Sequence, residues 1–94
     1  MKSELDTFDG LDNRREVMIL LERLGSDEAR AAFLWRLVGH SRNGFAAAQY
    51  RAEVRGHCDA ITAYYMLVGI CNEVGVSINA AARLLEAAVK GVTS

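Results

Sequence analysis

Proline is absent from the sequence, cysteine occurs only at Cys58 and Cys71, and no apolar run is long. Without proline, nothing forces a helix to break, because proline removes a helical hydrogen bond and its ring clashes with the preceding turn. The longest apolar stretch, residues 60–71, covers about twelve positions, whereas a membrane-spanning helix needs about 20. We therefore expect a helix-rich chain without a membrane span.

The two cysteines predict neither a disulfide nor a metal site. On one continuous helix they would lie about 20 Å apart, which is too far for a bridge. Two thiols in apolar surroundings, together with the lack of a signal peptide, indicate a reducing, cytoplasmic location. The spacing of His40, His57, Cys58 and Cys71 fits no zinc motif. The short chain also has no glycine-rich cofactor turn, so we expect no metal, no cofactor and no catalytic residue.

The chain has 94 residues, the length of one domain. Hydrophobic residues make up 51% of them, which is slightly more than usual. A domain of this size buries only roughly 60–65% of its unfolded surface. Some apolar surface is therefore expected to meet a second copy, which predicts a homo-oligomer, with a dimer favoured. The alternative is that alanine, which is easily exposed, inflates the apolar fraction.

The charge is nearly balanced, at a formal net value of −1, so no overall basic field favours nucleic acid. Its distribution is uneven. Residues 1–11 are polar and acidic and predict a flexible arm, with Leu5 and Phe8 as candidate docking residues, ahead of one helical domain at 12–94. The acidic side chains at the N-terminus are Glu4, Asp6, Asp9 and Asp12, and the basic middle of the chain contains Arg36, Arg42, Arg51 and Arg55. These two regions are expected to attract each other, either within one copy or between copies.

Local start and stop signals divide the domain into four predicted helices. Ser26 and Ser77 are natural N-caps, and Gly25, Gly39 and Gly75 are natural stops. The fold class is therefore all-α, a small helical bundle that forms an intertwined or packed homodimer. The predicted helices cover residues 12–25, 26–39, 45–74 and 77–91, and the first begins at Asp12 or Asn13.

The predicted long helix at 45–74 carries a seven-residue repeat over four heptads. One position is occupied by Ala47, Val54, Ile61 and Val68, and the position three residues later by Tyr50, His57, Tyr64 and Cys71. Such a seam packs helix against helix, either in a dimeric coiled coil or in an ordinary bundle. Gly56 is the position at which this helix is most easily bent.

Residues 67–86 resemble the helix-turn-helix pattern of bacterial and phage regulators. The small Cys71, the turn at Gly75 and the apolar residues around them occupy the expected places. The resemblance implies a DNA-binding transcriptional regulator whose second helix enters the major groove. Its candidate DNA contacts are Ser77, Asn79, Arg83 and Lys90. The same residues are also compatible with a helical hairpin that ends on a glycine cap, because Ala80, Ala81 and Ala82 fill much of the expected reading helix.

The loop at residues 39–44 is a candidate site for an anion or an acidic partner. It precedes a predicted helix, whose first N–H groups attract negative charge. The candidate residues are His40, Arg42, Arg51 and Arg55. The alternative is a solvated loop with scattered arginines, since the spacing and lysine of a phosphate-binding loop are absent.

The favoured function is therefore a non-enzymatic, α-helical protein-interaction module, acting as a small regulator, adaptor or inhibitor that covers a partner's surface. Aromatic and branched side chains are the usual anchors of such surfaces. The residues predicted to form the partner or oligomer interface are Phe33, Trp35, Tyr50, Val54, Ile61, Tyr64 and Tyr65.

Overall fold

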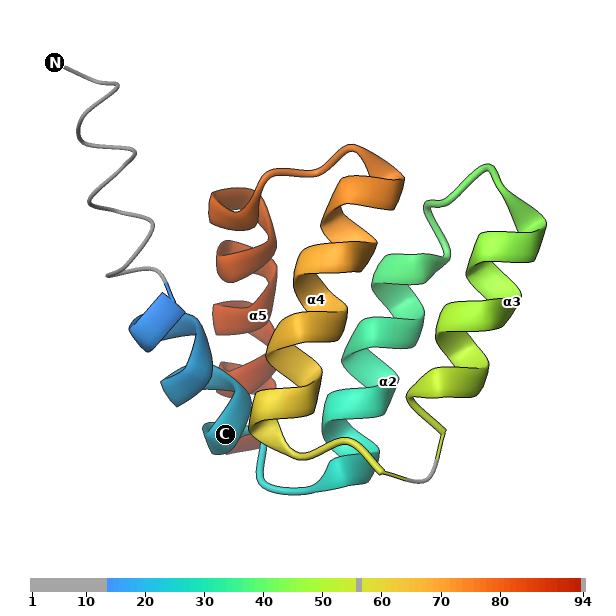
Figure 1. Ribbon diagram of the computed structural model, residues 1–94. Helices are drawn as coiled ribbons and strands as arrows, with labels where there is room; N and C mark the ends of the chain where they lie inside the picture. The colour runs from blue at the N-terminus through green and yellow to red at the C-terminus, as the bar shows by residue number, and fades with distance from the viewer. Residues whose placement is uncertain (1–13, 56, 94) are drawn as a thin grey trace, which may run out of the picture.

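The computed structural model describes residues 14–55 and 57–93, and these residues fold into helices joined by short connections. A helical segment at residues 14–23 is followed by α2 (Asp27–Val38), α3 (Gly44–Glu53), α4 (Ala60–Val74) and α5 (Ile78–Thr93) (Figure 1). The predicted all-α class is confirmed for these residues. None of their helices has the length and apolar character needed to cross a bilayer. The predicted arm at 1–11 and the predicted helix start at Asp12 or Asn13 lie outside the described residues.

The signals that were expected to start and stop helices do so. The hydroxyl oxygen of Ser26 accepts a hydrogen bond from the N–H of Ala29 at 3.1 Å, at the start of α2. Gly39 caps the end of α2, and the hydroxyl oxygen of Ser77 accepts a hydrogen bond from the N–H of Ala80 at 3.1 Å. These contacts satisfy backbone groups that a helix end leaves without an internal partner. Helix α5 continues two residues past its predicted stop at Gly91.

Gly75 ends α4 in a left-handed conformation, with φ at 76°. Its N–H donates to the carbonyl of Cys71 at 2.9 Å, and the N–H of Val76 donates to the same carbonyl at 3.0 Å. A side chain at this position would crowd the backbone, so glycine is the residue that allows the sharp reversal into α5.

The predicted long helix at 45–74 is wrong, because the structure divides it into α3 and α4. Helix α3 is capped at Val54, and residues 57–59 are not helical. Asp59 then starts α4, and its carboxylate accepts a hydrogen bond from the N–H of Thr62 at 2.8 Å. The described residues therefore contain five helical segments instead of the predicted four. Gly56, where a bend was considered, lies outside them.

The connection between α3 and α4 is held by side chains of α2. The guanidinium of Arg30 donates to the carbonyl of Cys58 at 2.6 Å, to the carbonyl of Leu21 at 2.9 Å and to Asp27 at 3.0 Å. The other carboxylate oxygen of Asp27 accepts from the N–H of Cys58 at 3.2 Å. One ion pair thus joins α2 to the end of the segment 14–23 and to the start of α4. The hydrogen bonds with Arg30 and Cys58 also lower the pKa of Asp27.

The break between α3 and α4 also ends the predicted seven-residue seam. Ala47 and Val54 are buried, but Ile61 is 58% exposed and Val68 is 39% exposed. A new helix starts at a new rotational phase, so the heptad positions of α3 do not continue into α4. The inward face of α4 consists of Ala63, Leu67, Ile70 and Cys71, and of these only Cys71 belongs to the predicted seam.

A single core lies between the helices, centred on the packing of α4 against α2. Figure 1 shows α4 between α2 and α5, with α3 on the far side of α2. The largest fully buried side chains come from four of the helices and from the connection at 54–58. They are Val17, Leu21, Leu34, Val38, Val54, Cys58, Leu67, Ile70 and Leu85.

Candidate functional site

The seven residues predicted to form an interface fall into three levels of exposure. Phe33 and Val54 lie in the chain's own core. Tyr50 and Tyr64 are half-buried and pack against that core. The exposed members are Trp35, Ile61 and Tyr65. A docking partner would therefore meet only part of the predicted set at the surface.

Trp35 does not share a surface with the other two exposed residues. It follows the buried Leu34 in α2 and is rotated about 100° from it. It lines a depression of about 310 Å³ together with Ala31, Ala32 and Arg55. Ile61 and Tyr65 instead belong to α4, so the predicted interface residues occupy two separate surfaces.

The exposed side of α4 carries three large side chains, which we call the α4 face: Ile61, Tyr65 and Val68. Their spacing of i, i+4 and i+7 aligns them along one side of the helix. They are 58%, 59% and 39% exposed. The helix has no charged residue before Glu73, so most of this surface is uncharged. Val68 was missing from the predicted interface, although its seven-residue distance from Ile61 was visible in the sequence.

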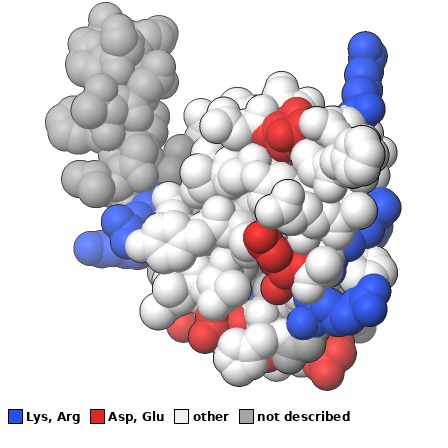
Figure 2. Space-filling view, turned by 45° about the vertical axis from the view of Figure 1, so that its right-hand side comes forward, with Lys and Arg blue, Asp and Glu red and all other residues white. Residues whose placement is uncertain are grey.

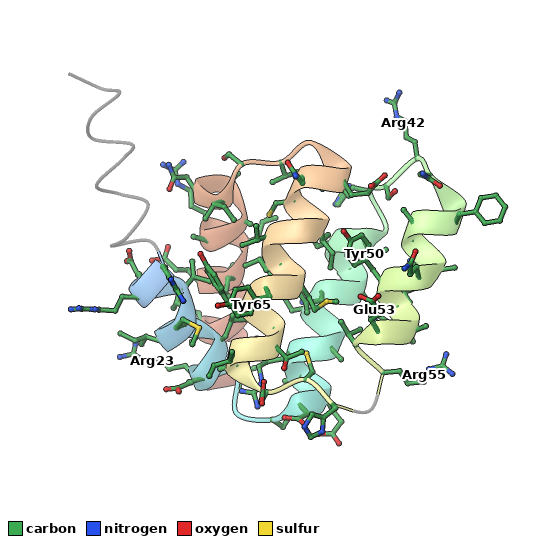
Figure 3. All side chains as sticks on the ribbon, in the orientation of Figure 1. Arg23, Arg42, Tyr50, Glu53, Arg55 and Tyr65 are labelled. Carbon is green, nitrogen blue, oxygen red and sulfur yellow. The ribbon has the colours of Figure 1, made fainter. Side chains whose placement is uncertain are left out.

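Arg14 lies at one edge of the α4 face. Its guanidinium is 5.6 Å from the ring centroid of Tyr64 and donates a long hydrogen bond of 3.4 Å to the hydroxyl of Tyr65. The two tyrosine rings meet edge to face, with centroids 5.6 Å apart. Stacking of a cation on an aromatic ring is worth roughly 0.5–1 kcal/mol at an exposed site. These contacts join the edge of the α4 face to the segment 14–23. Figure 3 shows Tyr65 on the side of α4 that is turned toward this segment.

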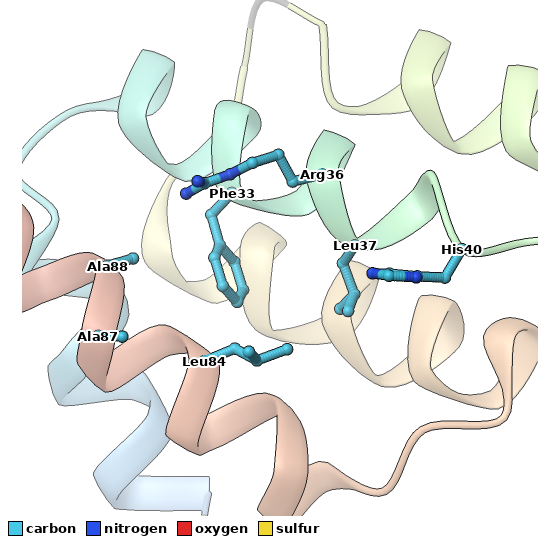
Figure 4. A pocket seen from close by; sticks show the side chains of 7 residues that line it. All are labelled: Phe33, Arg36, Leu37, His40, Leu84, Ala87 and Ala88. Carbon is cyan, nitrogen blue, oxygen red and sulfur yellow. The ribbon is translucent and has the colours of Figure 1, made fainter.

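A second apolar surface is a groove of about 340 Å³ between α2 and α5, which we call the α2–α5 groove. Figure 4 shows Phe33 and Leu84 pointing toward one another across it, with Arg36 and His40 along the α2 side. Phe33 is almost fully buried, whereas Leu84 is 49% exposed. The residues that line the groove are Phe33, Arg36, Leu37, His40, Leu84, Ala87 and Ala88.

The four residues of the candidate anion site are not gathered in one place. His40 and Arg42 share a shallow depression, which also contains the carboxylate of Glu73. Arg42 and Arg55 lie at opposite ends of α3 (Figure 3). The half-buried Arg51 has its guanidinium beside Gly39. In the face drawn in Figure 2, positive and negative side chains are interspersed on a mainly uncharged surface.

The thiols of Cys58 and Cys71 are both buried and free. Burial disfavours the charged thiolate, so it raises the pKa of Cys58 and raises that of Cys71 to about 11. A thiol with a raised pKa is a poor nucleophile. His57 is exposed beside the buried Cys58, and no group of three acidic, histidine or cysteine residues in the described part of the chain is arranged to hold a metal.

The helix-turn-helix resemblance falls on α4, the turn at Gly75 and α5. Figure 1 shows α4 and α5 running in nearly opposite directions on the two sides of this turn. Of the candidate DNA contacts, Ser77 caps α5, whereas Asn79, Arg83 and Lys90 are exposed along one side of it. Glu86 lies on the same side, so the region presents little net positive charge to phosphates.

Comparison with known proteins finds no matching family model, no matching curated protein and no matching solved structure. The α4 face and the α2–α5 groove are the two apolar surfaces that the described residues offer to a partner.

Proposed function

We propose that this chain is a non-enzymatic protein-interaction module that dimerises through the α4 face and regulates a partner by covering its surface. The observation that carries the proposal is the exposed, uncharged row formed by Ile61, Tyr65 and Val68. Large apolar side chains aligned on one side of a helix are the usual anchors for a helix of another chain.

The chemistry of the α4 face favours pairing with itself. In a two-fold dimer each surface patch meets its own copy, so a patch with charges of one sign would repel itself. The three side chains of the α4 face are uncharged, the one cation beside them, Arg14, lies at the edge of the face, and Tyr65 adds a large side chain with few rotatable bonds. Three side chains cover much less than the roughly 800 Å² per partner that stable interfaces bury. We therefore expect a dimer that dissociates on dilution and leaves the α4 face free for a partner.

In this proposal the chain acts by covering a partner's surface and not by catalysing a reaction. The buried thiols have raised pKa values and are poor nucleophiles. A partner helix that binds the α4 face would compete with the second copy for the same three side chains. Regulation then follows from mass action between the homodimer and the complex.

Light scattering over a dilution series tests the dimer. The wild-type mass should rise toward that of a dimer with concentration, whereas Ile61→Asn combined with Val68→Asn should remain monomeric. The matched control is Phe45→Ser, because Phe45 is 90% exposed but lies at the start of α3. The proposal fails if the wild type stays monomeric at its solubility limit. Loss of the dimer in Phe45→Ser alone would place the interface elsewhere.

A further inference from the structure

The α2–α5 groove is an apolar trough between two helices that are joined through a third. Helix α4 packs against both α2 and α5 and lies between them in Figure 1. Phe33 and Leu37 of α2 line the groove together with Leu84, Ala87 and Ala88 of α5. The alanine side chains are too small to close this space, and its volume of about 340 Å³ is at the lower end of the range for small-molecule sites.

The size of the groove favours a small ligand over a protein surface. Seven described residues line it, whereas a specific protein interface takes about 20–30 residues from each partner. On α2 the lining runs from Phe33 to His40, which is about 10 Å along the helix axis. An extended chain advances roughly 1.2 Å per bond, so an alkyl chain of about eight to ten carbons matches this length.

Arg36 supplies a positive charge beside these apolar walls. It stands on the α2 side of the groove, with His40 one helical turn later (Figure 4). No carboxylate occurs among the described residues that line the groove, and no ion pair or hydrogen bond within the described part of the chain engages the Arg36 guanidinium. His40 also borders the depression that contains Glu73, so Arg36 is the cation that an anion in the groove would meet.

A guanidinium is matched by a carboxylate, because the two groups form parallel hydrogen bonds in a fixed geometry. A ligand with a positive head group would place like charge beside Arg36, and a neutral one would lack the ion pair. The groove therefore favours a ligand that combines one apolar chain with one negative head group.

We propose that the α2–α5 groove binds a small amphiphilic carboxylate, such as a medium-chain fatty acid, with its alkyl chain along Phe33 and Leu84 and its carboxylate on Arg36. The chain covers Leu84, which is 49% exposed without a ligand, and the ring of His40 offers the head group a further hydrogen-bond donor. The site is separate from the α4 face and does not rest on the proposed dimer.

Amide spectra of the full-length, isotope-labelled protein test the site when octanoate is added below its micelle concentration. The signals of Leu37, Leu84 and Ala88 should shift and saturate, whereas those of Ile61 and Val68 on the α4 face should stay in place. Shifts of equal size on both surfaces would mean that octanoate only coats exposed apolar side chains. The absence of a saturable shift in the groove would also refute the site.

Matched ligands separate the contributions of the chain and the head group. Acetate has the head group without the chain and should not shift the groove signals. Octan-1-ol and octylammonium have the chain with a neutral or a positive head group. Both should bind about three- to tenfold more weakly than octanoate, because they lose the charge-assisted hydrogen bonds with Arg36. Equal affinity for octanoate and octan-1-ol would overturn the assignment of a carboxylate.

Substitutions locate the two ends of the ligand. Arg36→Gln should weaken the binding of octanoate by the same factor and leave that of octan-1-ol unchanged, and Arg83→Gln is its control, since Arg83 is exposed on α5 and does not line the groove. Leu84→Ser should weaken both ligands, and its control is Val92→Ser, which alters a side chain of α5 that is 55% exposed. All four side chains are exposed, so these variants should fold like the wild type. Octanoate binding that ignores Arg36→Gln, or falls equally in Arg83→Gln, would contradict the proposed position.

Dilution distinguishes a ligand site from a contact between copies. Without octanoate, the groove signals should be independent of protein concentration. Groove signals that shift on dilution would mean that a second copy occupies the groove, and they would overturn the ligand site. Oligomeric state reports on the α4 face and octanoate affinity reports on the groove, so either proposal can fail without the other.

Discussion

The side-chain hydroxyl of Tyr50 in α3 packs directly on Gly69 in α4. A Cβ atom added at residue 69 would lie 2.8 Å from the Tyr50 hydroxyl oxygen and 3.4 Å from two ring carbons. The close approach of the Tyr50 side chain to α4 therefore depends on a missing side chain in the interior of that helix. Glycine costs about 1 kcal/mol in a helix relative to alanine, so this contact is maintained against the local preference of α4.

Gly69→Ala should destabilise the protein, because the new methyl group forces the Tyr50 ring away from α4. In a Tyr50→Phe background, the nearest contacts are the ring carbons at 3.4 Å. There the same substitution should become neutral or stabilising by up to about 1 kcal/mol, through the helix propensity of alanine. Urea unfolding of both single variants and the double variant measures this coupling. Additive effects would contradict the close contact.

Stability should fall in acid through Asp27. Its pKa in the folded protein is below the ordinary value of 3.8, because Arg30 and the N–H of Cys58 hold its ionised form. Between these two values the unfolded chain binds more protons than the folded one, so stability falls as the pH drops below about 4 toward the folded pKa. The contribution is fully present at neutral pH. The pKa of Asp59 is also lowered, because its carboxylate accepts a hydrogen bond from the backbone N–H of Thr62.

Asp27→Asn should therefore reduce the loss of stability between neutral and acidic pH, as measured by urea unfolding at both. Glu28→Gln is the matched control, since Glu28 is the exposed neighbour in the same helical turn. Equal acid sensitivity in the wild type and in Asp27→Asn would contradict the role of this carboxylate.

Neither cysteine should react with a thiol reagent in the folded protein at neutral pH. Both thiols are buried, and the pKa of Cys71 is about 11, so the reactive thiolate is scarce and shielded from solvent. Both should react at once in denaturant. The absorbance released by a disulfide reagent, with and without denaturant, gives the number of reactive thiols. Fast labelling of the folded chain would show that the α3–α4 connection or the end of α4 opens readily.

Two apolar residues of α4 should differ sharply in their effect on stability. Leu67 is fully buried and Ile61 is 58% exposed. Leu67→Ala should cost about 2–5 kcal/mol, because it leaves a cavity, whereas Ile61→Ala should change stability by only about 0.5 kcal/mol. Thermal or urea unfolding checks both, in dilute solution where the proposed dimer is dissociated. A large loss of stability in Ile61→Ala under these conditions would mean that Ile61 is buried, so that the rotation of α4 about its axis differs from that in the structure.

Local chemistry made much of the fold predictable. Ser26, Ser77 and Gly75 act where the sequence placed them, because capping depends on one side chain or one backbone angle and on residues only a few positions away. The candidate surfaces were harder to predict. Ile61 and Tyr65 were identified as interface residues and are exposed, but the groove between α2 and α5 brings together residues about 50 positions apart and left no recognisable pattern.

The sequence by itself determined that this chain is helical, where most of its helices begin and end, and how its charge is distributed. Tertiary structure alone decided that residues 45–74 form two helices. The non-helical connection is bound by Arg30 and Asp27, which are 28 and 31 positions from Cys58. A hydrogen bond between residues that far apart exists only after the chain has folded back on itself, so no local pattern around the connection could reveal it. The same break set the rotation of α4 and thereby exposed Ile61, Tyr65 and Val68.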